Sequence, residues 1–180
     1  MDSIENLKYP IGKYKWSSSQ PTAEQKRNLL EVLINFPEQL RKEVEGMNET
    51  QLQTPYREGG WSVAQVVHHL ADSHAHAYLR CKHALLEKQP EIKDYTEADW
   101  ASLEDATSND LSPSLSIIGG IHSRWAKFFK SLSEDEFNLE YNHPERSKNY
   151  PLYIVLELYT WHSLHHLEHI RVLKKNMDWK

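Results

Sequence analysis

The most informative stretch of this 180-residue chain is WHSLHHLEHI, at residues 161–170. In an α-helix, residues three, four and seven positions apart share one face. The histidines of the stretch have this spacing, and their face continues an apolar stripe that includes Leu158, Tyr159 and Leu173. The stretch therefore predicts a helix whose core-facing side is interrupted at one level by imidazoles. Those histidines are His162, His165, His166 and His169.

A cluster of imidazoles on a buried face favours a bound metal ion. Neutral imidazoles are costly to bury without hydrogen-bond partners, and clustering makes their protonation mutually unfavourable. A cation removes both problems because it takes the imidazole lone pairs. The competing interpretation, preferable for a single histidine, is a core ring hydrogen-bonded to a neighbour. Two i, i+4 pairs, His162/His166 and His165/His169, could each meet one ion, and spacing alone does not choose between them.

A second histidine-rich segment, WSVAQVVHHLADSHAHAYLR at residues 61–80, predicts a facing helix that supplies a third ligand. A catalytic zinc site needs three protein ligands and an open position, and His69 lies at the edge of this helix's apolar side. Asp72 shares the face of His69 and could act as a catalytic base, orient a ligand or simply face solvent. His76 shares it too, and is expected to line the pocket or support the ligands.

The remaining histidines of this segment, His68 and His74, are interpreted as solvent-exposed. His68 points about 100° away from His69 around the helix. The sequence contains no HExxH, Walker A, GxSxG or GxGxxG motif. The corresponding zinc-protease, nucleotide-binding and serine-hydrolase sites are therefore not predicted.

Helical periodicity recurs in four segments, whereas strand signals are sparse. The expected helices run from Pro21–Thr22 to Met47, from Trp61–Ser62 to Lys88, from a serine cap at Ser112–Pro113, and from Pro151 to Lys175. Pro37 is expected to kink or divide the first helix because proline removes a helical hydrogen bond. Residues 90–111, with a possible short helix, and residues 135–149 are interpreted as connections. The pattern predicts an all-α fold, a four-helix bundle.

Length and composition indicate a soluble protein with one domain, residues 1–180, whose core needs no disulfides. The lone cysteine, Cys81, excludes an intramolecular disulfide. The N-terminus lacks an apolar signal segment, and no apolar run approaches the roughly 18 residues of a membrane span, so a cytoplasmic location is expected. The net charge of −5, with scattered lysines and arginines, argues against a nucleic-acid partner.

Three longer segments together resemble the YfiT branch of the DinB-like superfamily. They are YPIGKY at residues 9–14, TPYREGGWSVAQVVHHLADSH at residues 54–74 and YTWHSLHHLEHI at residues 159–170. The shorter matches HSRW, at residues 122–125, and HPE, at residues 143–145, are also similar to that family's pattern. The resemblance spans nearly the whole chain.

The resemblance implies a four-helix bundle, one divalent metal ion and often a homodimer. Its metal ligands would be the second histidine of HHxAD and the first and last of HxxHH, which are His69, His162 and His166 here. His165 and His169 would then be pocket or supporting residues. Zinc is the expected ion, and nickel is the alternative.

Three functions are compatible with such a site. The first is a metal-dependent hydrolase that activates water against a small-molecule substrate. The second is a thiol S-transferase that uses a low-molecular-weight thiol such as bacillithiol, since related family members are thiol transferases. The third is a non-catalytic bundle stabilised by its metal.

Overall fold

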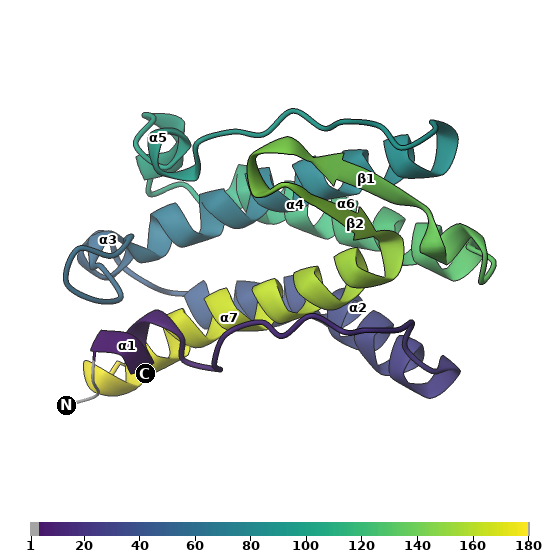
Figure 1. The fold of residues 1–180 in the computed structure, drawn as a ribbon. Helices are drawn as coiled ribbons and strands as arrows, with labels where there is room; N and C mark the ends of the chain where they lie inside the picture. The colour runs from purple at the N-terminus through teal and green to yellow at the C-terminus, as the bar shows by residue number, and fades with distance from the viewer. Residues whose placement is uncertain (1–3, 180) are drawn as a thin grey trace.

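Four long helices make up most of the computed structural model, which describes residues 4–179 (Figure 1). They are α2 (Ala23–Val44), α4 (Val63–Leu86), α6 (Ser112–Ser131) and α7 (Leu152–Asn176). Both α4 and α2 pack against α6 and α7. The predicted all-α four-helix bundle is confirmed. Within residues 4–179, no helix combines the length and apolar character needed to span a membrane.

Short elements occupy the connections. They are α1 (Ile4–Lys8), α3 (Glu49–Gln53), α5 (Glu97–Trp100), the 3-10 helices η1 (Asp105–Thr107), η2 (Glu136–Asn138) and η3 (Pro144–Arg146), and the strands β1 (Glu140–His143) and β2 (Lys148–Pro151). The two strands pair antiparallel with Tyr141 opposite Tyr150, in a stretch predicted to be a connection. Each strand has only four residues, too few for its alternation to stand out in the sequence.

Local capping signals explain where the long helices begin. Thr22 caps α2 and Ser62 caps α4, each through a reciprocal capping box with the glutamine three residues later. The predicted serine cap of α6 is wrong. Ser112 is already helical, and the carboxylate Oδ1 of Asp110 accepts its backbone N–H at 3.0 Å.

Helix α2 continues through Pro37, so of the two expected effects of this proline, a kink or a division, the division is wrong. Leu33 and Phe36 precede the proline and Leu40 follows it, and all three are fully buried. Burial of one continuous apolar face on both sides of the proline stabilises the helix, because helices in proteins depend mainly on tertiary packing.

The core consists of two apolar clusters separated by a layer of histidines. On α7, one cluster ends at Tyr159 and the other begins at Leu167. The other long helices break at the same level, between Leu33 and Phe36 on α2, Ala71 and Ala77 on α4, and Ile118 and Trp125 on α6. The interruption predicted on α7 therefore extends across all four helices.

An N-terminal strap, residues 9–21, runs along α7 between α1 and α2 (Figure 1). The Tyr14 ring lies 5.9 Å from that of Trp161, and the Tyr14 hydroxyl donates a hydrogen bond to Glu157 Oε2 at 3.4 Å. The strap thus covers α7 beside the histidine layer.

Candidate metal centre

Three histidines from two helices converge in the histidine layer. They are His69 of α4 and the i, i+4 pair His162 and His166 of α7, and their ring nitrogens lie within 4.8 Å of one another. The Nε2 atoms of His69 and His162 are 3.3 Å apart. A tetrahedral zinc ion with bonds of about 2.0–2.1 Å also holds its nitrogen ligands about 3.3 Å apart. The geometry therefore suits three ligands of one ion.

Burial keeps these three imidazoles neutral. It lowers the pKa of His69 to about 4. It also lowers the pKa values of His162 and His166 well below 6.5, and the neighbouring histidines lower them further. At neutral pH each ring therefore carries a free lone pair, the form in which histidine binds metals.

A second set of three, His165, His166 and His169, also has ring nitrogens within 4.8 Å. The two sets share His166. His169 Nε2 lies 3.3 Å from the Lys8 carbonyl oxygen, and His169 Nδ1 lies 3.3 Å from His166 Nδ1. Because a carbonyl only accepts, a neutral His169 carries its proton on Nε2, toward Lys8, and keeps its lone pair on Nδ1. All three members of the second set belong to α7, whereas the first set joins α4 and α7.

A cavity of about 420 Å³ lies over the histidines. Both His165 and His169 line it, as do His69, His162 and His166. The other lining residues are Lys8, Tyr9, Tyr56, Arg57, Trp61, Ser73, Glu97, Arg146, Leu158, Tyr159 and Trp161. Aromatic walls around a few convergent polar groups are typical of small-molecule sites.

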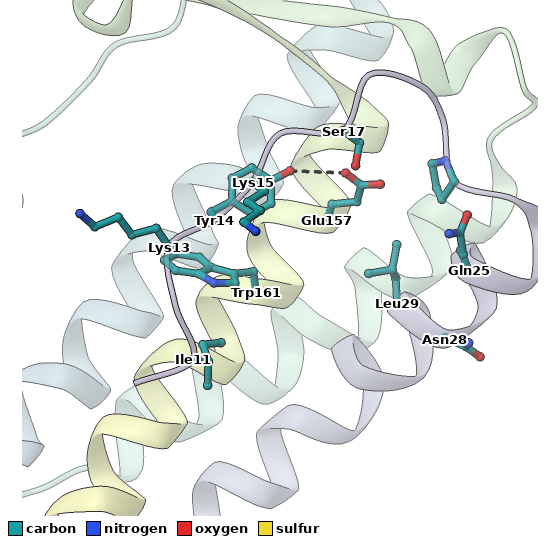
Figure 2. Close-up of a pocket in the computed structure, with 11 residues that line it drawn as sticks. Ile11, Lys13, Tyr14, Lys15, Ser17, Gln25, Asn28, Leu29, Glu157 and Trp161 are labelled. Carbon is teal, nitrogen blue, oxygen red and sulfur yellow. Dashed lines mark hydrogen bonds between the residues drawn. The ribbon is translucent and has the colours of Figure 1, made fainter. Parts of the chain in front are cut away.

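A larger cavity of about 550 Å³ lies between the N-terminal strap, α2 and α7 (Figure 2). Trp161 lines both cavities, and its ring stacks on His165 with centres 4.5 Å apart. The larger cavity includes Tyr14 and Glu157, but its lining in the described chain contains no histidine or cysteine. Size alone therefore does not identify the metal centre.

The sequence profile of the DinB superfamily matches residues 33–170. This chain belongs to the DinB superfamily. The resemblance predicted from its motifs is confirmed.

Relatives of this chain match it over nearly its whole length. A YfiT protein of Bacillus subtilis (strain 168), whose name proposes a metal-dependent hydrolase, is 44% identical over 174 residues, 97% of each chain. A similarly named protein of Geobacillus thermodenitrificans (strain NG80-2) is 43% identical over 180 residues, 99% of this chain and all of its own. The solved structure of Bacillus subtilis YfiT, described as a four-helix bundle of unusual topology, matches with a TM-score of 0.94 at 43% identity. The match covers 97% of this chain and 99% of the YfiT chain.

In this DinB-superfamily bundle, His68 and His74 are buried, with exposed fractions of 6% and 0%. The prediction that they face solvent is wrong because α6 and η1 pack against that side of α4. His68 Nδ1 lies 2.8 Å from Ser114 Oγ, and its Nε2 lies 2.9 Å from the Ser108 carbonyl oxygen.

The position of His74 could have been recognised from the sequence. It follows Leu70 by four residues and precedes Ala77 by three, so it lies on the apolar stripe of α4. Its ring nitrogens contact His122 and His162. His122 follows Ile118 by four residues on the apolar stripe of α6, and gave the same signal.

Asp72 and His76 lie outside the cavity lining. The pKa of Asp72 is raised by burial and then by Asp105 of η1, on another side of α4. This placement argues against the predicted base role, because a base must reach the reacting groups. His76 lies about 10 Å beyond His69 along the helix, where its ring stacks on Tyr95 with centres 4.6 Å apart.

Glu97 and Arg146, two of the charged residues of the lining, come from connections and had no sequence signal. Glu97 of α5 and Arg146 of η3 lie with Oε1 and Nη2 3.6 Å apart. Neither element has helical or strand periodicity that could have placed it. Only the folded chain brings this ion pair to the cavity.

Proposed function

We propose that this chain is a metal-dependent hydrolase in which His69, His162 and His166 hold one zinc ion. The convergence of three imidazoles beside a cavity, with His69 and His166 buried and His162 half-buried, carries the proposal. The names of the Bacillus subtilis and Geobacillus thermodenitrificans relatives support it. Nickel is the alternative ion, because imidazole ligands suit both metals.

The residues present fit a divalent ion. The lowered pKa values keep the ring lone pairs available at neutral pH. Three neutral ligands also leave the ion's positive charge uncompensated. A divalent ion there would supply Lewis acidity and acidify water at an open coordination position.

The remaining cavity residues bind and orient the substrate in this proposal. Trp61 lies against His69, with ring centres 4.7 Å apart, and Trp161 forms another wall. These rings offer apolar surface to a small molecule. Arg146, held by Glu97, offers guanidinium donors to a substrate oxygen.

Elemental analysis of protein purified without a histidine tag tests the metal. We expect one zinc ion per protein chain. Hydrolysis of ester and amide substrates, with and without low-molecular-weight thiols, then tests the reaction. Metal-dependent hydrolysis without thiol is expected. Turnover that appears only when a thiol is consumed, for example with monochlorobimane, would instead support a thiol S-transferase. A metal without an exchangeable water would support a structural role.

Three further expectations from the sequence stay predictions. They are a homodimer, a cytoplasmic location, and a small-molecule substrate in place of nucleic acid. Sedimentation of the purified protein tests the first, and cell fractionation tests the second.

A further inference from the structure

A chain of hydrogen bonds leads from His162 into the core and ends on a backbone carbonyl. His162 Nδ1 lies 3.1 Å from His74 Nε2. His74 Nδ1 lies 2.7 Å from His122 Nε2, and His122 Nδ1 lies 2.6 Å from the carbonyl oxygen of Leu33. We call these four groups, one from each long helix, the His162 relay.

The last member sets the direction of every bond in the His162 relay. A carbonyl oxygen can only accept, so His122 Nδ1 carries the proton. A neutral imidazole has one N–H, so His122 Nε2 accepts from His74 Nδ1. By the same rule, His74 Nε2 accepts from His162 Nδ1. His162 therefore keeps its lone pair on Nε2, the atom that faces His69 Nε2 at 3.3 Å.

Pro37 explains why the Leu33 carbonyl is available inside a helix. In α2, the backbone N–H that would bond this carbonyl belongs to the residue four positions later. That residue is Pro37, which has no N–H. The buried carbonyl would lack a helical partner, and the His122 imidazole supplies one.

We propose that His74 and His122 are positioning residues, which hold His162 as the Nδ1–H tautomer with its Nε2 lone pair directed at the metal. Pro37 contributes by freeing the acceptor at the end of the relay. The inference deepens the proposed metal site and rests on it. Outer hydrogen bonds of this kind orient ligands, and their loss typically lowers metal affinity about 10- to 100-fold.

Replacement of His122 by phenylalanine removes the relay's connection to Leu33 while keeping a ring in the core. His74 Nδ1–H then has no acceptor, so His74 is expected to move its proton to Nε2 and donate to His162. His162 would in turn carry its proton on Nε2, where it blocks metal binding.

His68→Phe is the matched control. His68 is also a buried histidine with two hydrogen bonds, but it lies outside the relay. Loss of core polar contacts should destabilise both variants, whereas only His122→Phe should affect the tautomer of His162.

The experiment has two arms. Long-range ¹H–¹⁵N NMR of the metal-free wild type reads the tautomers, and competition with a chelator measures zinc affinity of the wild type and both variants. We expect Nδ1–H on His162, His74 and His122, and zinc binding at least about 10-fold weaker in His122→Phe than in His68→Phe.

An Nε2–H tautomer of His162 in the wild type, or equal zinc affinity of the two variants, would overturn the inference. If His122→Phe does not fold, the wild-type tautomers still decide. The tautomers are read without metal, so they test the relay even if hydrolysis is never detected. Conversely, a relay that fails in a protein with metal-dependent hydrolysis leaves the proposed function intact.

Discussion

The two ligands on α7 are supported very differently. Behind His162, each link of the relay measures 2.6 to 3.1 Å and the final acceptor, Leu33, is fully buried. Behind His166 the contacts are longer. His166 Nδ1 lies 3.3 Å from His169 Nδ1, and His169 Nε2 lies 3.3 Å from the Lys8 carbonyl oxygen. Lys8 ends α1, a five-residue helix without buried residues.

The same rule fixes the donors and acceptors in both chains of contacts: a carbonyl oxygen only accepts, and a neutral imidazole has one N–H. The Lys8 carbonyl accepts from His169 Nε2, so His169 Nδ1 accepts from His166 Nδ1, and His166 keeps its lone pair on Nε2. The difference is in what holds the final acceptor. One carbonyl belongs to the four-helix core, while the other belongs to a short peripheral helix that must depend on its contact with α7. His162 should therefore be the more rigidly oriented ligand.

Removal of either α7 ligand should reduce zinc affinity strongly, whatever hydrogen bonds support that ligand. His162→Ala and His166→Ala should each reduce zinc affinity by more than the roughly 100-fold upper range of an outer-shell change. His69→Ala should do the same. Chelator competition and elemental analysis measure the effect, with His68→Ala as the control. Retention of full zinc by either α7 variant would contradict the proposed ligand set.

Acid should destabilise the metal-free protein through the core histidines. Burial lowers the pKa of His122 from 6.5 to about 4, so the unfolded chain binds a proton there that the folded chain does not. The free energy of unfolding should therefore fall as pH drops from about 6.5 to about 4, and this group should have no effect above that range. His122 alone corresponds to about 3 kcal/mol.

Urea unfolding of the metal-free protein at several pH values measures this slope. His122→Phe should show a shallower slope than His68→Phe, because it lacks the group concerned. A free energy of unfolding that stays constant between pH 6.5 and pH 4 would contradict the neutral, buried state of the histidine layer.

His169→Phe should weaken zinc binding less than His122→Phe. The phenylalanine ring can keep the stacking on Tyr56, whose ring centre lies 4.0 Å from that of His169. Only the two long contacts are lost, so we expect a loss below the roughly 10-fold lower range for outer-shell changes. A larger loss than in His122→Phe would reverse the proposed ranking of the two sides.

Pro37→Ala should have the smallest effect on zinc affinity. It restores a backbone N–H that can bond the Leu33 carbonyl, but a carbonyl oxygen has two lone pairs and can still accept from His122. We expect a change of about threefold or less, within 0.7 kcal/mol. The imidazole proton of His122 should shift in NMR as its acceptor is shared. An unchanged His122 signal would show that the proline is not coupled to the relay.

Sequence reasoning predicted the long helices, the serine cap of α4, the interrupted face of α7 and the superfamily. Each depends on residues close in the chain, where periodicity and capping chemistry act directly. The signals for His74 and His122 were also present, as polar residues on apolar stripes. They did not predict the contacts of these residues, because a single histidine on an apolar stripe does not reveal its partner.

The sequence by itself therefore determined which faces of this chain are helical, apolar and rich in imidazole. Only the tertiary structure decided that α2, α4, α6 and α7 meet at one level, so that a carbonyl freed by Pro37 lies beside His122. It also decided that Glu97 and Arg146 reach the cavity, and that Asp72 does not. The physical reason is that periodicity defines a face within one helix, whereas the pairing of faces depends on packing between residues far apart in the chain.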